Sequence, residues 1–186
     1  PVEVPQGAIR LNTDSQKLEF YAQDQWWQMA THNIDLDGGT RGIFGGGYGS
    51  APHQYMNRID YITIETAGNS VDFGDMSTAR SAKTGGASST RGLFQGGRFS
   101  PSSDGYNIID YITFSSTGNA QDFGDLAERN PGAHGLANQT RSLFAGGYTQ
   151  PSQTYVNTIE YVTIASTGDA KDFGDVPLSS NMRNFN

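Results

Sequence analysis

The residues most suggestive of chemistry are the two carboxylates of Asp72-Phe-Gly-Asp75 and the glycines of Gly45-Gly-Gly47. Asp-Phe-Gly binds magnesium in protein kinases, but only together with a catalytic loop, a strand lysine and a phosphate-covering loop. None of these accompanies it here, and the tripeptide occurs three times. The glycine run does not open a helix and so forms no phosphate cradle. We interpret the first as a turn and the second as a strand end that needs positive φ or close backbone approach.

Acidic side chains recur and could bind a hard cation through oxygen ligands. They are Asp60, Asp110, and Asp72 and Asp75 with their copies. Calcium loops of the Asp-x-Asp-x-Asp-Gly type are absent from the chain. We therefore interpret these side chains as solvated turn carboxylates that bond backbone amides, and we predict no metal site.

One arginine recurs at a fixed spacing, as Arg41, Arg91 and Arg141. Two interpretations are open. The three guanidinium groups could form a ring that binds an anionic ligand. Alternatively, each could link structural units by pairing with backbone carbonyls or with the acidic set Asp60, Asp110 and Glu160. We favour the structural link.

Nucleophilic and metal-binding chemistry finds no support in the remaining residues. The three histidines, His32, His53 and His134, occupy unrelated positions and make no triad or metal set. There is no cysteine, which removes disulfides, thiol catalysis and thiolate zinc sites. We predict no catalytic residue, no cofactor and no enzymatic activity.

Composition and charge narrow the class of protein. The net charge of −7 over 186 residues argues against nucleic-acid binding, which needs clustered Lys and Arg. No apolar run approaches the length of a membrane-spanning helix. With 24 glycines and 11% aromatic residues, and no window of apolar residues at helical spacing, the chain is predicted to be all-β.

The elements that position these residues repeat every 50 residues. Arg41-Gly-Ile-Phe-Gly-Gly-Gly-Tyr48 returns as Arg91-Gly-Leu-Phe-Gln-Gly-Gly-Arg98 and as Arg141-Ser-Leu-Phe-Ala-Gly-Gly-Tyr148. Such a period indicates a propeller, solenoid or array. We name the copies repeat 1 (41–90), repeat 2 (91–140) and repeat 3 (141–186). Fourteen positions are identical in all three. Half of them are glycines and aromatic residues, interpreted as turn glycines and strand-end aromatics that the packing of each unit requires.

Each repeat is interpreted in the same way. In repeat 1, strands are predicted at 40–44, 57–64 and 70–73, and a Ser/Ala/Gly-rich connecting segment at 76–89. A variable polar loop at 48–56 follows the glycine pair, with counterparts at 98–106 and 148–155. These loops fall at the same place in each repeat and suit adaptable polar contacts and aromatic stacking. Their candidate ligand-binding residues are Tyr48, His53, Tyr55, Arg98, Phe99, Tyr106, Tyr148 and Tyr155.

Residues 1–33 form a separate module. Alternating runs at 8–11 and 17–21 flank a polar turn, and a third strand follows at 26–29, which predicts a small β-meander. Its expected apolar contacts are Ile9, Leu11, Leu18, Phe20 and one tryptophan. A three-stranded unit is marginally stable alone, so it should pack on a neighbour or on copies of itself.

Two resemblances follow from these motifs. Gly7-Ala-Ile-Arg-Leu-Asn-Thr-Asp14 with Lys17-Leu-Glu-Phe-Tyr21 and a following tryptophan resembles a short module of bacteriophage tail-fibre and other virion appendage proteins. Residues 34–186 resemble kelch repeats, with Gly46-Gly47, Tyr61 and Phe73 at the places of the family's glycine doublet, tyrosine and tryptophan. The repeats are also similar to those of virion structural proteins of marine phages and cyanophages.

The kelch resemblance implies propeller blades, and three blades do not close a ring. Either the chain is a segment of a longer polypeptide, or several chains pool blades around one axis; we favour the segment. Kelch-fold copper oxidases use a cysteine-crosslinked tyrosine, which this chain lacks.

The sequence therefore predicts a virion-located, non-enzymatic tail-fibre or capsid-fibre structural protein that acts in host-surface recognition or particle architecture. Its expected partners are other virion proteins, itself (as a homo-oligomer, with a trimer as one candidate) and a host-surface glycan or protein. Neither nucleic acid nor membrane insertion is expected. The alternatives are a cellular or secreted kelch-like protein- or glycan-binding module, and a sugar-active propeller enzyme.

Overall fold

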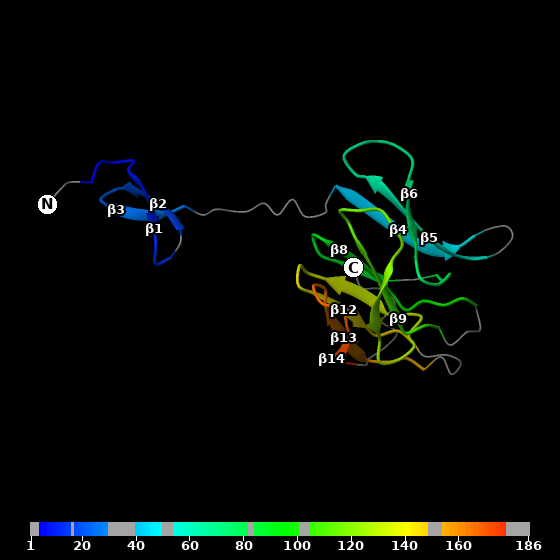
Figure 1. Ribbon diagram of the computed structural model, residues 1–186. Helices are drawn as coiled ribbons and strands as arrows, with labels where there is room; N and C mark the ends of the chain where they lie inside the picture. The colour runs from blue at the N-terminus through cyan, green and yellow to red at the C-terminus, as the bar shows by residue number, and fades with distance from the viewer. Residues whose placement is uncertain are drawn as a thin grey trace. The chain divides into compact units, whose positions relative to one another are not determined.

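The computed structural model describes residues 4–15, 17–29, 40–49, 54–81, 84–100, 105–148 and 154–177. Within them the chain is all-β, as predicted: four small antiparallel sheets are present and no helix occurs. The chain divides into two compact units, Pro1–Asp35 and Leu36–Asn186, and most of their strands are labelled in Figure 1. No helix in the described ranges is long and apolar enough to cross a membrane.

The first unit is a three-stranded antiparallel meander. β1 (Ile9–Asn12) pairs with β2 (Lys17–Ala22), which pairs with β3 (Gln25–Gln28). The side-chain oxygen of Asn12 accepts hydrogen bonds from two backbone N–H groups of the first turn, as asparagine commonly does in tight turns. The hairpin and the third strand predicted from the sequence are confirmed.

The residues expected to make apolar contacts are cross-strand neighbours, but most of them stay exposed: Ile9 lies opposite Phe20, Leu11 opposite Leu18, and Phe20 opposite Trp27. Ile9, Leu11 and Leu18 are exposed, Trp27 is exposed on the same sheet, and Phe20 is half-buried. The physical reason is that a single three-stranded sheet has no second layer to cover its apolar face. The unit therefore presents an uncovered apolar surface.

A polar cluster organises the unit instead. Glu19 is the buried side chain; its carboxylate pairs with the Arg10 guanidinium at 2.8 Å and accepts a hydrogen bond from Asn12 at 2.9 Å. The bond from Asn12, followed by that from Arg10, lowers the pKa of Glu19. The Arg10 guanidinium also lies 4.1 Å from the centre of the Trp26 ring, a cation–π contact.

The second unit contains three sheets that follow one another along the chain (Figure 1). Sheet 1 consists of β4 (Arg41–Tyr48), β5 (Tyr55–Thr63) and β6 (Val71–Asp75). Sheet 2 consists of β7 (Thr84–Ala87), β8 (Arg91–Gln95), β9 (Ile108–Thr113) and β10 (Gln121–Asp125). Sheet 3 consists of β11 (His134–Ala137), β12 (Arg141–Ala145), β13 (Thr158–Thr163) and β14 (Lys171–Asp175). In each sheet, consecutive strands are neighbours.

The sequence repeat is matched by a repeat in the pairing register of the strands. The recurring arginines at 41, 91 and 141 lie opposite Thr63, Thr113 and Thr163, respectively. In sheets 1, 2 and 3, the last strand contains the same bulge within its Asp-Phe-Gly segment. The predicted strands near 40–44, 57–64 and 70–73 are confirmed, with ends that differ by a few residues.

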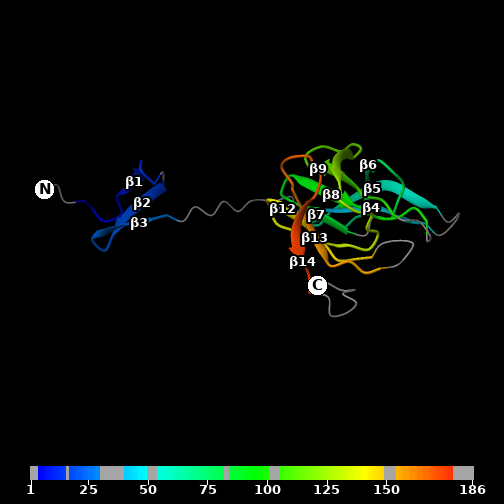
Figure 2. The ribbon, with the colours of Figure 1, turned by 90° about the horizontal axis from the view of Figure 1, so that it is seen from below.

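Two strands lie in segments interpreted as connections. β7 and β11 belong to repeats 1 and 2 in sequence, but each pairs with the first strand of the next repeat, β8 and β12. β7, which is labelled in Figure 2, also contacts β11, the corresponding strand of sheet 3. A Cβ added to Gly86 would collide with the Ser142 side chain. Glycine is needed here because neighbouring sheets approach closely. Because glycine has low strand propensity, these segments were not recognised as strands in the sequence.

The hydrophobic core lies between sheets. Between sheets 1 and 2, one layer comes from Ile59, Phe73 and Met76, and the facing layer from Ile112 with Phe94 and Phe114. Between sheets 2 and 3, the equivalent residues form the same two layers: Leu93, Ile109, Phe123 and Leu126 against Phe144, Val162 and Ile164. Both faces of sheet 2 are therefore covered, whereas sheets 1 and 3 are each covered on one face by the other described strands.

Candidate functional site

The recurring arginines link neighbouring sheets through backbone carbonyls. The Arg41 guanidinium donates a 2.7 Å hydrogen bond to the carbonyl of Phe114, and Arg91 donates a 2.9 Å bond to that of Ile164. Each guanidinium also stacks on the tyrosine of its own sheet, 4.9 Å from the Tyr61 ring centre and 4.7 Å from that of Tyr111. The structural interpretation through carbonyls is confirmed for Arg41 and Arg91, whose hydrogen-bond partners here are not acidic. Arg141 stacks on Tyr161 in the same way, 4.7 Å from the ring centre, and its link to a further sheet stays a prediction.

The Asp-Phe-Gly-Asp segments of β6 and β10 form a second link between neighbouring sheets. The carbonyl of Phe73 accepts a 2.7 Å bond from the N–H of Gly118, and the N–H of Asp75 donates to the Asn119 side chain at 3.0 Å. Gly74 has φ of +145°, and a Cβ there would collide with the backbone of Gly118. The interpretation as a turn is wrong, because residues 72–75 lie in strand β6, at its bulge. The glycine is required by the docking of the next sheet.

The glycine pair meets both predicted backbone requirements, positive φ and close approach. The predicted strand end is wrong in repeat 1, where the pair lies at a bulge inside β4, and right in repeats 2 and 3, where the pair directly follows β8 and β12. Gly46 and Gly47 have φ of +67° and +126°, and a Cβ on Gly46 would collide with the carbonyl oxygen of Arg80. The corresponding pairs in repeats 2 and 3 also have positive φ. Because glycine has no Cβ, these positions leave room for the segment that follows the last strand of the same repeat and passes close to the pair.

The acidic positions do not assemble a metal centre. Among the described residues, no group of three or more His, Asp or Glu side chains is placed to hold a metal ion. Asp60 instead pairs with Arg58 at 2.7 Å on the surface. Asp110, in contrast, is fully buried.

Asp110 is the acceptor of a buried polar cluster that sequence reasoning missed. Its carboxylate lies 2.9 Å from the Arg80 guanidinium, and both side chains are 0% exposed. The N–H and the hydroxyl of Ser77 donate to the same carboxylate oxygen at 3.1 and 2.9 Å. Arg80 also donates to the carbonyl of Phe94 at 3.3 Å. Arg80 is not among the repeated positions, so no pattern in the sequence marked it.

The candidate binding residues form one aromatic pair per loop. The rings of Tyr48 and Tyr55 are 4.9 Å apart, and those of Phe99 and Tyr106 are 5.1 Å apart. Tyr148 and Tyr155 are joined by an isolated backbone bridge at the same place in repeat 3. In each case the two residues lie at the two ends of the variable loop, which they close.

These pairs leave aromatic surface exposed. Tyr48, Phe99 and Tyr155 are exposed, and the other aromatic member of each pair is half-buried. Arg98 differs from the rest, because it is half-buried and its backbone carbonyl accepts from the N–H of Ser81 at 2.9 Å. His53 lies outside the described residues.

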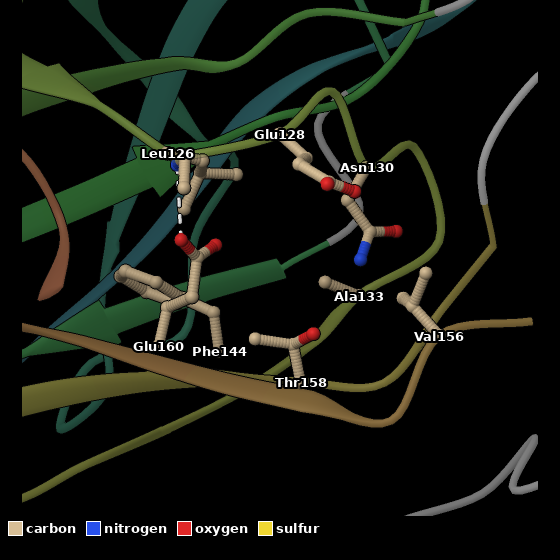
Figure 3. A pocket seen from close by; sticks show the side chains of 9 residues that line it. Leu126, Glu128, Asn130, Ala133, Phe144, Val156, Thr158 and Glu160 are labelled. Carbon is tan, nitrogen blue, oxygen red and sulfur yellow. Dashed lines mark hydrogen bonds between the residues drawn. The ribbon is translucent and has the colours of Figure 1, made fainter. Parts of the chain in front are cut away.

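A small cavity of about 100 Å³ opens between sheets 2 and 3. Its lining includes Leu126, Glu128, Asn130, Ala133, Phe144, Val156, Thr158 and Glu160 (Figure 3). The Glu160 carboxylate accepts a 2.9 Å hydrogen bond from the N–H of Ala127. Burial raises the pKa of Glu160, and this hydrogen bond opposes the rise.

No protein-family model matches the chain, and no curated protein matches it either.

Proposed function

We propose that the chain is a non-enzymatic structural protein of a bacteriophage particle, of the tail-fibre or capsid-fibre type. In this proposal, the three sheets of the second unit are kelch-like propeller blades, the loops recognise a host-surface glycan or protein, and the first unit attaches the chain to other virion proteins. Its location is the virion. The resemblances of residues 7–27 and 34–186 supply the virion and kelch assignments.

The binding proposal rests on a difference between the identical positions of the repeat, which pack, and its variable loops, which expose aromatic rings. Many of the positions identical in all three repeats are used for packing. Arg41, Arg91 and the Asp-Phe-Gly segments connect neighbouring sheets, and the glycine pairs leave room for the connecting segment. The loops vary in sequence, yet each keeps an aromatic pair with exposed ring surface. Exposed aromatic side chains on loops over a rigid scaffold are well suited to stacking on sugars and to protein contacts.

The blade assignment is supported by the way the sheets meet. Two sheets have four antiparallel strands in sequential order, which is the composition of a propeller blade. The contacts between sheets 1 and 2 recur between sheets 2 and 3, down to the same arginine–carbonyl bond. Each sheet therefore stands in the same relation to the next.

The two end sheets expose complementary faces. Phe44 of sheet 1 is 57% exposed, whereas its equivalent Phe144 is 2% exposed against sheet 2. Phe173 of sheet 3 is 51% exposed, whereas its equivalent Phe123 is 2% exposed. Each end face can thus take the opposite face of a further sheet, supplied by a second copy of the chain. Two copies would supply six such sheets, within the four to eight blades of known propellers.

Removing residues 7–27 tests the attachment role. We expect the truncated chain to be lost from purified particles, because the exposed apolar face of Ile9, Leu11 and Leu18 goes with it. The repeats should keep their unfolding midpoint, since they form a separate compact unit. The measurement is the amount of chain per particle by quantitative mass spectrometry. A chain carrying Ile9→Ser and Leu11→Ser is the milder companion variant, and normal incorporation of both variants would contradict attachment through this unit.

Removing the exposed rings tests the recognition role. In the chain carrying Tyr48→Ser, Phe99→Ser and Tyr155→Ser, we expect adsorption of particles to host cells to fall by about tenfold or more. This corresponds to the loss of roughly 1.4 kcal/mol of binding free energy. Leu136→Ser is the matched control, because Leu136 is equally exposed but lies on β11, away from the loops. Equal adsorption by the loop variant and the control would contradict recognition through the loops.

A further inference from the structure

The cavity between sheets 2 and 3 has a filled counterpart between sheets 1 and 2. Residues at equivalent positions differ by 50 in number, so Asn130 corresponds to Arg80, and Glu160 corresponds to Asp110. At the first junction, the Arg80 side chain is completely buried against the Asp110 carboxylate. At the second junction, the space beside the carboxylate is a cavity of about 100 Å³ (Figure 3).

The cavity arises from side chains that are smaller at the second junction. Asn130 replaces Arg80, and its amide turns to the backbone, where it donates to the carbonyl of Gly146 and accepts from the N–H of Tyr148. Val156 and Thr158, which also line the cavity, stand where the first junction has Tyr106 and Ile108. All three differences remove side-chain volume around one point. The acid, however, is retained.

The lining that remains is suited to a cation. Glu160 and Glu128 line the cavity. Among the described residues no basic side chain pairs with the Glu160 carboxylate, which accepts a hydrogen bond from the N–H of Ala127. The corresponding N–H, that of Ser77, donates to Asp110 in the same way. The half-buried Glu160 carboxylate therefore keeps the backbone donor of the first junction but lacks the Ser77 hydroxyl and the guanidinium. Burial without a cation raises the pKa of Glu160, which is the expected cost of a carboxylate left without its partner.

We propose that this cavity binds a guanidinium group in the position that Arg80 occupies at the first junction. The group would pair with the Glu160 carboxylate, and the carbonyl of Phe144 corresponds to the Phe94 carbonyl that accepts from Arg80. A planar guanidinium presents several fixed donors to such acceptors, whereas an ammonium ion is a strongly hydrated point charge. The guanidinium belongs either to a small molecule or to an arginine side chain of a partner protein.

The first experiment measures binding of methylguanidinium chloride to the whole chain. The readouts are the unfolding midpoint and the amide NMR signal of Ala127, with methylammonium chloride and sodium chloride as controls for ionic strength. We expect a saturable shift of the Ala127 signal with methylguanidinium and a much smaller change with the controls. The shift should weaken as the pH falls through the raised pKa of Glu160, because protonation removes the negative charge.

Two variants decide whether the cavity is the site. Asn130→Arg supplies a tethered guanidinium, so we expect its midpoint to rise and the methylguanidinium response to vanish. Glu160→Gln removes the charge but keeps the shape, and its response should fall at least tenfold. An unchanged response in both variants, or no saturable response in the parent chain, would overturn the proposal.

Chemical rescue at the first junction provides an internal control. Arg80→Asn should open an equivalent cavity beside Asp110, and methylguanidinium should partly restore the lowered unfolding midpoint of this variant. Failure of rescue together with failure in the parent chain would reject the cavity as a guanidinium site.

The source of the group is separated by comparing free arginine with a short peptide that contains one internal arginine. Binding of the peptide at least tenfold tighter than free arginine assigns the site to a partner's side chain. Equal or weaker binding of the peptide assigns it to a small molecule. Binding of neither ligand overturns the proposal.

Discussion

The Arg80→Met variant is expected to lose about 3–5 kcal/mol of unfolding free energy, the usual cost of removing one partner of a buried ion pair. The guanidinium and the Asp110 carboxylate are 2.9 Å apart and both are 0% exposed. Removing the guanidinium leaves Asp110 charged and buried between sheets 1 and 2. The donors on Ser77 satisfy one carboxylate oxygen, but neither carries a charge. Urea unfolding of the variant and the parent chain measures the difference.

The equivalent acid of repeat 1 provides the matched control. Asp60 pairs with Arg58 at a comparable distance, but the Arg58 side chain is 56% exposed. Water replaces a lost partner at an exposed site, so Arg58→Met should change stability little. The double variant Arg80→Met with Asp110→Leu should recover much of the loss, because it removes the stranded charge. If Arg80→Met proves as mild as Arg58→Met, the buried pair does not stabilise the junction.

The Phe123→Ala variant is expected to lose about 3–5 kcal/mol of unfolding free energy relative to the parent chain, which is typical of truncating a buried phenylalanine. Phe123 is 2% exposed and belongs to the core between sheets 2 and 3. Its ring meets that of Tyr111 edge to face, with the centres 5.8 Å apart. Truncation leaves a cavity between the two sheets, where both the ring contact and the burial are lost.

Phe173→Ala is the control, because Phe173 occupies the same Asp-Phe-Gly-Asp context and makes the same contact with Tyr161, at 5.9 Å. It is 51% exposed, so its loss should be well below that of Phe123→Ala. Both variants are compared by urea unfolding at a dilution where sedimentation shows single chains. If the two variants lost equal unfolding free energy as single chains, Phe173 would have to be covered by something other than a second copy of the chain.

Local pattern was sufficient to predict much of the fold. Turn residues between alternating runs located β1, β2 and β3. The glycine pairs located the ends of β8 and β12, and the short run that includes Asp72-Phe73 located β6. The link from Arg41 to a carbonyl could be proposed, because a residue needed once in every repeat is more economically explained by architecture than by a site. The closure of each loop by an aromatic pair is also visible as a spacing in the sequence, although the contact itself was not predicted.

Features that depend on a neighbouring sheet escaped prediction. β7 is a Thr-Gly-Gly-Ala segment without strand propensity, and it is a strand because β8 and β11 flank it. The Arg80–Asp110 pair joins residues 30 positions apart that carry no shared pattern. The meander's apolar residues were expected to be covered, yet Ile9 and Leu11 are exposed.

The three repeats separate local from tertiary information. Because hydrogen-bonded turns and alternating strands are short-range properties, the sequence alone indicated three strands of each repeat and the residues that every sheet requires. Burial is a property of neighbours, so only the tertiary structure could show that Phe123 is covered while Phe173, in an identical tetrapeptide, is exposed. For the same reason, only the tertiary structure reveals the cavity at Asn130, since it exists through comparison with the space that Arg80 fills.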